Sequence, residues 1–371
     1  MSMEDKTRVL FVAPGREELL TGGIGKWTCN ILGYYNSIID STDIELVHCV
    51  NRKSKQTWGV SGFVKRVKTG ILNYLPVIKE AKEELKHSHF SVVHSCSSCS
   101  IGLFRDLIIT HLAHKYGAKS VVHFHCGSIP YIMQSNGWQH RCLESLLHKV
   151  DWAIVMDGKS YEVLQNKGYT NVKYVPNPLS LETQKLIDEY GSVPRIPGKI
   201  VFVGQVLRTK GVMELADACR DIPNVQVEYV GHLPESEFAE ALKEKTSTDK
   251  FIFRGAIPYP DVIQEMLSAS IFVLPTYTEG FPNVIIESMA CGCPIITCPV
   301  GAIPEMLNIE SDEPCGICVP SQNVEKLREA IEYVLNHPSE AAIMGDRARK
   351  RVYAEYSVDK VWKELAEVWS A

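Results

Sequence analysis

The feature that most constrains the fold is a regular alternation of short apolar, β-branched runs with helical segments along the 371 residues. Strands separated by helices of this length form right-handed βαβ units and parallel sheets. The expected strands of the first half are Arg8–Ala13, Ile44–Val50, Ser91–Ser95, Ser120–His125, Trp152–Met156 and Val172–Val175. Those of the second half are Lys199–Val203, Val225–Val230, Phe251–Phe253, Ile271–Leu274, Pro294–Thr297 and Gly316–Val319. Because the chain is too long for one ordinary core, it predicts two α/β domains, each built on a doubly wound parallel sheet.

Composition excludes several functional classes. Hydrophobic residues make up 45% and charged residues 22% of the chain, as in globular proteins. The net charge of −5 gives no general reason to bind nucleic acid. No apolar run approaches the roughly 18 residues that span a bilayer, and the start MSMEDKTRVL has no signal-peptide core. A cytoplasmic location is therefore expected.

The twelve cysteines are spread over the chain and often lie in apolar runs, which is typical of buried free thiols. Two CxxC pairs, Cys96/Cys99 and Cys315/Cys318, leave a zinc or redox site as the alternative. A four-thiolate zinc site would require the two pairs to converge, although they fall in different expected domains. We therefore predict no metal site, and stoichiometric zinc in the purified protein would contradict this.

The segment from Ser270 to Leu307 carries the clearest chemistry. A buried strand, Ile271–Leu274, leads into a polar loop and then into an expected helix over Asn283–Ala290. The N–H groups at such a helix start attract an anion. Glu279 and Glu287 flank that position and can accept hydrogen bonds from hydroxyl groups on either side of it. A diphosphate with a polyol at each end, as in a nucleotide sugar, fits this pattern.

This segment resembles the paired-glutamate signature of the retaining glycosyltransferases of family four (glycosyl transferases group 1), which have two Rossmann-like domains facing a cleft, the GT-B fold. The resemblance rests on Glu279-Gly280-Phe281-Pro282-Asn283 followed by Glu287-Ser288-Met289-Ala290-Cys291-Gly292. It implies that Glu279 lies near the donor sugar and that Glu287 holds the ribose. The remaining donor-binding residues that it implies are Gly280, Phe281, Pro282, Asn283 and Val284. The alternative is a helix that carries an incidental glutamate pair.

A glycine-rich stretch follows the first strand. Gly22, Gly23 and Gly25 would let the backbone approach a ligand at the start of a helix over about 26–39. The spacing fits neither a Walker loop nor GxGxxG. It resembles the loop that closes over donor and acceptor in the GT-B family, while a plain structural turn is the alternative.

Two histidines lie near the end of the strand Ser120–His125, in His123-Phe124-His125. Residues two apart on a strand share a face, and only the terminal one reaches the loop layer. We therefore favour His125 over His123 as the match to the family's active-site histidine, which contacts the transferred sugar. A packed core histidine is the alternative.

The loop after Lys199–Val203 supplies cations. The family usually has an arginine after the first glycine of this loop and a lysine before the second, both facing the diphosphate. Lys210 matches the lysine, whereas Gln205 stands in the arginine position. Arg208 is a candidate to replace the missing charge.

The stretch Arg52–Lys79 contains seven basic and no acidic residues, interleaved with Trp58, Phe63 and other apolar side chains. This pattern indicates either an amphipathic surface that docks on an anionic membrane or a solvated loop and helix face. The partners expected are a nucleotide sugar, a glycan or lipid-linked acceptor, and possible peripheral contact with the inner face of a membrane.

The domain boundaries are expected at 1–182 for an acceptor-binding domain and 183–352 for a nucleotide-sugar-binding domain. Residues 353–371 form a closing helix on the first domain, since apolar residues recur at helical spacing from Val358 to Val368. Val175-Pro176-Asn177-Pro178 resembles the family's boundary motif, and the stretch 191–198 with its two prolines serves as a linker.

These features predict a hexosyltransferase that moves a sugar from a UDP- or GDP-linked donor to a hydroxyl acceptor in polysaccharide, lipopolysaccharide or other glycan biosynthesis. Retention of anomeric configuration is implied by the resemblance alone. The chain contains no Asp-x-Asp pair, so no metal and no other cofactor is expected. The catalytic residues would be His125, Glu279 and Lys210. A sugar-nucleotide-binding protein without turnover is the alternative, and an epimerase or phosphorylase has no supporting residues.

Overall fold

The computed structural model describes residues 6–15, 23–51 and 63–371, and it divides the chain into two compact units. Unit 1 comprises Met1–Pro178 and Val358–Ala371, and unit 2 comprises Leu179–Ser357. The sequence analysis places these boundaries after 182 and after 352. The expected linker over 191–198 lies inside unit 2, because helix α7 (Leu181–Tyr190), which precedes it, packs on two other helices of unit 2.

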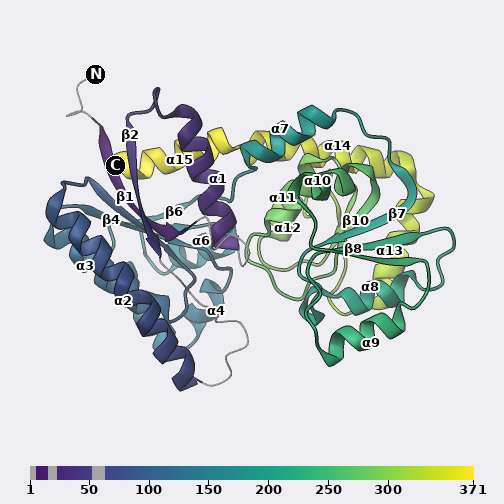
Figure 1. Cartoon of the computed structure of the whole chain (residues 1–371), viewed down its shortest axis with the longest axis horizontal. Coiled ribbons are helices and arrows are strands. Elements are labelled where there is room, and N and C mark those ends of the chain that lie inside the picture. Colours follow the sequence, from purple (N-terminus) through teal and green to yellow (C-terminus); the bar gives the residue numbers. More distant parts are fainter. Residues whose placement is uncertain (1–5, 16–22, 52–62) are drawn as a thin grey trace. The chain divides into compact units, whose positions relative to one another are not determined.

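Unit 1 is built on a parallel sheet with the strand order β2-β1-β3-β4-β5-β6 among the described residues (Figure 1). Its strands are β1 (Thr7–Pro14), β2 (Ile44–Asn51), β3 (Val92–Ser97), β4 (Lys119–Phe124), β5 (Trp152–Val155) and β6 (Val172–Tyr174). Its helices are α1 (Gly23–Ile38), α2 (Phe63–His87), α3 (Gly102–Lys115), α4 (Ile129–Gln134), α5 (Trp138–Leu147), α6 (Gly158–Asn166) and α15 (Val358–Ser370). Each strand expected in the first half is found.

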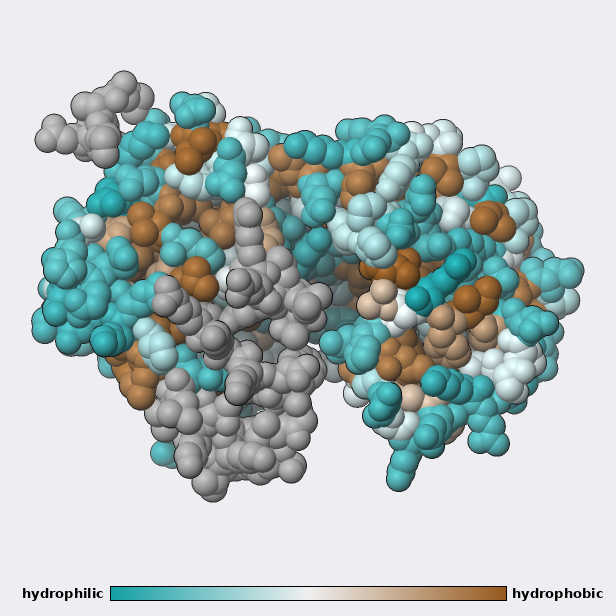
Figure 2. Space-filling view, in the orientation of Figure 1, coloured by the Kyte–Doolittle hydropathy of each residue, from teal (hydrophilic) through white to brown (hydrophobic). Residues whose placement is uncertain are grey.

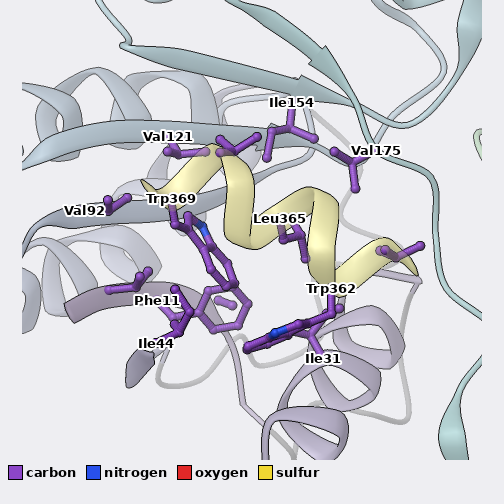
Figure 3. Close-up of a cluster of buried hydrophobic side chains, with 14 of the residues drawn as sticks. Phe11, Ile31, Ile44, Val92, Val121, Ile154, Val175, Trp362, Leu365 and Trp369 are labelled. Carbon is purple, nitrogen blue, oxygen red and sulfur yellow. The ribbon is translucent and has the colours of Figure 1, made fainter. Parts of the chain in front are cut away.

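Side chains of β1 alternate between the two faces of this sheet. Val9 and Phe11 join a core that α1 and α15 cover, whereas Leu10 and Val12 join a core that α2 and α3 cover. Figure 3 shows α15 lying across the first of these cores, with Trp362, Leu365 and Trp369 directed into it. The C-terminal helix is therefore a structural part of unit 1, since its apolar stripe is buried there.

Unit 2 is built on a second parallel sheet, ordered β12-β11-β10-β7-β8-β9 among the described residues. Its strands are β7 (Ile196–Val203), β8 (Gln226–Val230), β9 (Phe251–Gly255), β10 (Ala269–Leu274), β11 (Ile295–Thr297) and β12 (Ile317–Cys318). The helices besides α7 are the 3₁₀ turn η3 (Arg208–Lys210), α8 (Val212–Cys219), α9 (Glu237–Lys245), α10 (Tyr259–Ser268), α11 (Asn283–Ala290), α12 (Ile303–Met306), α13 (Val324–Asn336) and α14 (Pro338–Glu355). The strands expected in the second half are all present.

Both strand orders contain a point where the chain changes its direction of travel across the sheet. In unit 2 this point lies between β7 and β10, which are neighbours although β8 and β9 intervene in the sequence. In open parallel sheets, ligands bind beyond the carboxyl ends of the strands at such a switch point. The loops that follow β7 and β10 are therefore the positions in unit 2 where a ligand is expected.

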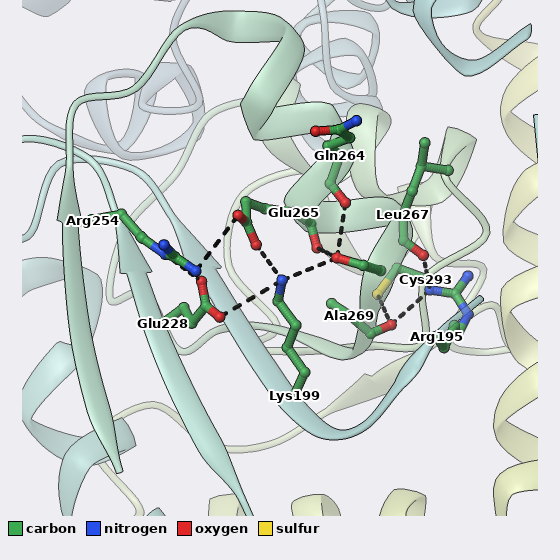
Figure 4. A network of polar contacts seen from close by, with 10 residues as sticks. Arg195, Lys199, Glu228, Arg254, Gln264, Glu265, Leu267, Ala269 and Cys293 are labelled. Carbon is green, nitrogen blue, oxygen red and sulfur yellow. Dashed lines mark hydrogen bonds and ion pairs between the residues drawn. The ribbon is translucent and has the colours of Figure 1, made fainter. Parts of the chain in front are cut away.

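A buried ionic network ties α10 to the sheet of unit 2 (Figure 4). Lys199 of β7 and Glu228 of β8 are 5% and 1% exposed, and Lys199 Nζ lies 3.6 Å from Glu228 Oε1. Lys199 also donates to Glu265 of α10, and Arg254 Nε donates to Glu228 at 2.8 Å. Each buried charge thus has an opposite partner, as the cost of desolvation requires.

The visible face of the described residues is largely hydrophilic, with hydrophobic side chains in small scattered patches (Figure 2). Within the part of the chain that the structure describes, no helix combines the length and the apolar character needed to cross a membrane.

Candidate functional site

The loop from Pro275 to Pro282, which connects β10 to α11, forms the centre of the site in unit 2. Tyr277 N donates to Thr209 O at 2.9 Å, which fixes the loop against the segment that follows β7. On the other side, Ala302 N donates to Gly280 O at 2.9 Å. The loop is therefore held between the segments that follow β7 and β11, at the switch point of the sheet.

Two glycines allow this close approach. Gly211 has φ +70°, and a Cβ there would lie 2.0 Å from Pro275 O. Gly301 has φ +58°, and its Cβ would lie 2.4 Å from Glu279 O. Since both positions combine left-handed backbone with direct backbone contact, only glycine fits at either without moving the loop.

The structure brings the expected lysine and the first expected glutamate together. Lys210 Nζ donates to Glu279 Oε1 at 2.5 Å, and the two side chains are 26% and 13% exposed. Arg208, in the same turn η3, and Gln205 are both exposed. The loop therefore presents one cation that is paired with Glu279 and a second that faces solvent.

The second expected glutamate lies on α11, five residues beyond the end of the loop at Pro282. Glu287 is 9% exposed, and Tyr259 Oη donates to its Oε1 at 2.8 Å. Phe281 is buried and packs edge-on against Tyr356 with ring centroids 5.6 Å apart. Asn283 and Val284 occupy the first turn of α11. Pro282 immediately precedes the helix with ψ 117°, so α11 begins at Asn283, as the sequence analysis expects.

The carboxyl end of α11 is held by two arginines. Arg349 Nη2 donates to Cys291 O at 2.9 Å, and Arg195 Nη1 donates to Ala269 O at 2.7 Å while its other nitrogen reaches the backbone after α11. Cationic side chains at this end satisfy carbonyl groups that a helix leaves without partners and complement its dipole. The position of α11, and with it Glu287, is thereby fixed from the far end.

In unit 1, His125 follows β4 directly and lies among aromatic rings. Its ring stacks on His123 with centroids 4.1 Å apart and meets Trp27 of α1 at 4.6 Å. Burial lowers the pKa of His125 to about 3, so the imidazole is neutral at ordinary pH. His123 is fully buried between Trp27 and His94, which is the position of a core residue.

The glycine-rich stretch is described only in part. Gly22 lies outside the described residues, whereas Gly23 begins α1, three residues before the expected start, and Gly25 lies in its first turn. Among the described residues, a Cβ added to Gly23 would meet nothing within 4 Å. The loop's proposed contact with a ligand stays a prediction. Trp27 nevertheless places this helix start beside His125.

Two further sequence expectations concern cysteines and the basic stretch. All twelve cysteines are free thiols, with Cys96 and Cys99 in unit 1 and Cys315 and Cys318 in unit 2. Within the described ranges, no three His, Cys, Asp or Glu side chains gather as a metal site would need. Residues 52–62 of the basic stretch Arg52–Lys79 lie outside the described residues, and its remaining residues belong to helix α2, which begins at Phe63.

Sequence reasoning missed Tyr259 and Gly301. Tyr259 lies 28 residues before Glu287 on another helix, so no local pattern connects the two. Gly301 had a detectable signal, because Val300-Gly301-Ala302 joins a strand to a helix start that contains a proline.

The arrangement in unit 2 combines a helix start, a lysine and two carboxylates at one edge of a sheet. A helix start and a lysine stabilise negative charge on phosphate oxygens, and carboxylates accept hydrogen bonds from hydroxyl groups. The site can therefore bind a molecule that carries both phosphates and hydroxyl groups.

Comparison with known proteins agrees with this chemistry. Residues 192–351 match the model of the family "Glycosyl transferases group 1". The chain is 27% identical over 241 residues to the capsular polysaccharide biosynthesis glycosyltransferase CapM of Staphylococcus aureus, an alignment that covers 61% of this chain and 60% of CapM. It is 23% identical over 323 residues to the putative teichuronic acid biosynthesis glycosyltransferase TuaC of Bacillus subtilis, covering 81% and 80% of the two chains.

Solved structures share the whole fold. A sucrose-phosphate synthase from Thermosynechococcus elongatus superimposes with a TM-score of 0.75 at 18% identity, covering 98% of both chains. Anabaena Alr3699/HepE, solved in complex with UDP, gives a TM-score of 0.71 at 16% identity over 98% of this chain and 99% of that one. At these identities the likeness establishes the fold alone.

Proposed function

We propose that the chain transfers a sugar from a nucleoside diphosphate donor to a hydroxyl group of a growing glycan, because residues 192–351 match the group 1 glycosyl transferase family and the chain has the GT-B fold. The observation that carries the proposal is the pairing of Lys210 with Glu279 at the switch point of unit 2, next to the helix that bears Glu287. Polysaccharide assembly is the expected pathway, since CapM and TuaC are named for capsular polysaccharide and teichuronic acid biosynthesis.

In the proposed reaction, Lys210 and the start of α11 stabilise the negative charge that the departing diphosphate gains. Glu279 lies near the transferred sugar, and Glu287 accepts hydrogen bonds from the ribose. The departing phosphate oxygen takes the proton of the acceptor hydroxyl, so the attack needs no separate protein base. The resemblance assigns His125 a contact with the transferred sugar, and the lowered pKa of its imidazole makes it a neutral hydrogen-bonding group rather than a cation.

Two finer features are part of the proposal. The anomeric configuration is retained, which an NMR spectrum of the first product formed would show. Catalysis proceeds without a metal ion, so EDTA should leave the rate unchanged. Loss of activity in EDTA that Mg²⁺ or Mn²⁺ restores would contradict the second feature.

The test begins with a thermal-shift screen of UDP- and GDP-sugars, followed by an assay for release of the nucleoside diphosphate. HepE is solved with UDP and with UDP-glucose, which favours starting from UDP donors. We expect Glu279→Gln and His125→Ala to lower turnover while a nucleotide still binds, and Glu287→Gln to weaken nucleotide binding.

Glu340→Gln serves as the control, because it alters a carboxylate outside the proposed site. Glu340 lies on α14 and accepts a hydrogen bond from the exposed Tyr333 of α13. Binding without transfer or hydrolysis for every donor and acceptor would favour a sugar-nucleotide-binding protein instead. A screen in which no nucleotide sugar raises the unfolding temperature would contradict the proposal.

Peripheral membrane contact through Arg52–Lys79 is a second, separate proposal, and it rests on the sequence pattern alone. Flotation with liposomes that contain anionic lipid should recover more protein than flotation with neutral liposomes. Equal recovery with both would rule out an electrostatic membrane contact.

A further inference from the structure

Glu287 is held by a chain of hydroxyl groups that comes from two other helices. Tyr259, the first residue of α10, donates from Oη to Glu287 Oε1 at 2.8 Å. Thr183 Oγ1 of α7 lies 2.6 Å from the same Oη, and Ser180 Oγ lies 2.6 Å from Thr183 Oγ1. The three helices α7, α10 and α11 pack on one another, so these contacts lie where the helices meet.

The chemistry of the groups fixes the direction of every hydrogen bond in this chain. An ionised carboxylate only accepts, so the single proton of Tyr259 points to Glu287. Thr183 must then donate to Tyr259, and Ser180 must donate to Thr183. Ser180 Oγ in turn accepts from Thr183 N at 2.9 Å as the N-cap of α7. All three hydroxyl groups therefore donate towards Glu287, an order in which each bond polarises the next.

Burial makes this arrangement persistent. Thr183 is fully buried and Ser180 is 4% exposed, so neither hydroxyl is readily taken over by water. Burial, and then the charge of Glu287, raise the pKa of Tyr259, which keeps its hydroxyl protonated as a donor. A carboxylate with one oxygen held by such a donor is restricted in its rotation, which narrows the directions that its other oxygen can take.

We propose that Tyr259, supported by Thr183 and Ser180, is a positioning residue that orients the Glu287 carboxylate for the hydroxyl groups of the donor ribose. The inference rests on the proposed function, in which Glu287 accepts hydrogen bonds from the ribose of the donor. It extends that function to two residues far from Glu287 in the sequence. Tyr259 precedes Glu287 by 28 positions, and Thr183 precedes it by 104.

Tyr259→Phe tests the proposal, since it removes the hydroxyl and keeps the ring. The full chain is titrated with UDP, GDP and their 2′-deoxy analogues to obtain a Kd for each. For the base that binds more tightly, the affinity for the ribonucleotide is then divided by the affinity for its 2′-deoxy analogue, and we call this quotient the affinity ratio. We expect the Kd of the ribonucleotide and the donor KM to rise about ten- to a hundred-fold, the size of one lost hydrogen bond to a charged group. The affinity ratio should fall, whereas kcat and the acceptor KM should stay within about two-fold of wild type.

Thr183→Val should have a smaller effect of the same kind, about two- to five-fold, because it removes the donor to Tyr259 and leaves Tyr259 on Glu287. In a Glu287→Gln background, Tyr259→Phe should add little, since the two residues act through one interaction. Tyr333→Phe is the matched control, because it removes a Tyr–Glu hydrogen bond at an exposed position and should leave all binding constants unchanged.

The outcomes separate this inference from the function on which it rests. If Glu287→Gln weakens ribonucleotide binding while Tyr259→Phe leaves both the Kd and the affinity ratio at wild-type values, the positioning role is wrong and the proposed function stands. If Tyr259→Phe lowers the unfolding temperature but leaves the affinity ratio unchanged, Tyr259 contributes to stability only and does not orient Glu287. If Glu287→Gln has no effect on binding, the assignment of the ribose fails and the inference falls with it.

Discussion

Lys210 contacts the loop from Pro275 to Pro282 directly, through Glu279. It donates to Glu279, while Arg208, two residues earlier in the same turn η3, is exposed and Gln205 carries no charge. Arg208 is nevertheless close enough to Tyr277 for its charge to oppose the rise in the pKa of that phenol. The positive charge of the exposed Arg208 therefore acts on Tyr277, which belongs to the loop from Pro275 to Pro282.

The first prediction concerns these three side chains. Lys210→Ala should lower kcat by about a hundredfold or more, because it removes the charge opposite the leaving diphosphate. Arg208→Ala should lower kcat about tenfold, and Gln205→Ala should stay within about two-fold. Steady-state kinetics under saturating donor measure all three. Equal losses for Arg208→Ala and Gln205→Ala would show that Arg208 does not replace the missing arginine.

Three buried histidines of unit 1 predict a pH dependence of stability. Burial lowers the pKa of His94 and of His125 to about 3 and lowers that of His123 as well. His94 Nδ1 accepts a hydrogen bond from Trp369 Nε1 at 2.9 Å, which requires the nitrogen to be unprotonated. In the unfolded chain the same rings titrate near pH 6.5. Below that pH the unfolded state binds protons that the native state does not.

The free energy of unfolding should therefore fall as the pH falls below about 6.5, by up to about 1.4 kcal/mol per pH unit for each histidine. Denaturant unfolding at pH 7.5, 6.5 and 5.5 measures the slope. His125→Gln should reduce the slope by the contribution of one histidine. A slope that His125→Gln does not alter would contradict the assignment.

Residues of the site differ in how far the sequence could reveal them. Lys210, Glu279 and Glu287 stand in short motifs at a strand end and a helix start, so the local pattern was enough to propose them as site residues. Tyr259 was not predictable, because its hydroxyl meets Glu287 only after α10 and α11 have packed together. A tyrosine on a helix has no sequence signature that separates a core contact from a positioning one.

At the scale of elements, the approach of α14 to α11 depends on a glycine. A Cβ at Gly345 of α14 would lie 2.1 Å from Gly292 O, at the end of the helix that carries Glu287. Arg349, one turn further along α14, donates to Ala290 O and Cys291 O of the same helix end. Gly345 therefore lets α14 come close enough for its arginine to cap α11.

Gly345→Ala should lower the free energy of unfolding by about 1–3 kcal/mol, because the backbones must separate. It should also weaken nucleotide binding, since α11 shifts with them. Gly33→Ala, in the middle of α1 where a Cβ meets nothing within 4 Å among the described residues, should be neutral or stabilising by up to about 1 kcal/mol. Thermal and denaturant unfolding of both variants measure the difference, and equal effects would refute the close-approach argument.

Most of the strands and helices could be predicted from the sequence. Buried parallel strands are continuous β-branched runs, and each expected run coincides with a strand. The error was the linker over 191–198, whose prolines and glycines are equally typical of a loop inside a domain. What decides between the two is the packing of α7 on α10 and α11, which is a long-range contact.

At the scale of the whole molecule, unit 1 is discontinuous, since α15 returns to it after unit 2. Trp369 is 2% exposed, packs against Trp362 and donates to His94 of β3. Trp369→Ala should therefore destabilise unit 1 by about 3–5 kcal/mol. Hydrogen exchange should show lost protection in β1 and β3 and unchanged protection in β7 and β10.

Trp138→Ala is the matched control, because Trp138 is 37% exposed and stacks on the partly exposed Phe104. Its effect should be less than about 1 kcal/mol. If the two tryptophan variants were equally stable, α15 would not be contributing the buried contacts described for unit 1.

The return of α15 also has a consequence for biosynthesis. A ribosome that adds about 5–20 residues per second needs roughly ten to forty seconds to make unit 2, and throughout that time the first sheet lacks the helix that covers one of its faces. Unit 2 is contiguous and can complete its own core as it emerges. The half of the protein that is translated first is therefore the last to have both faces of its sheet covered.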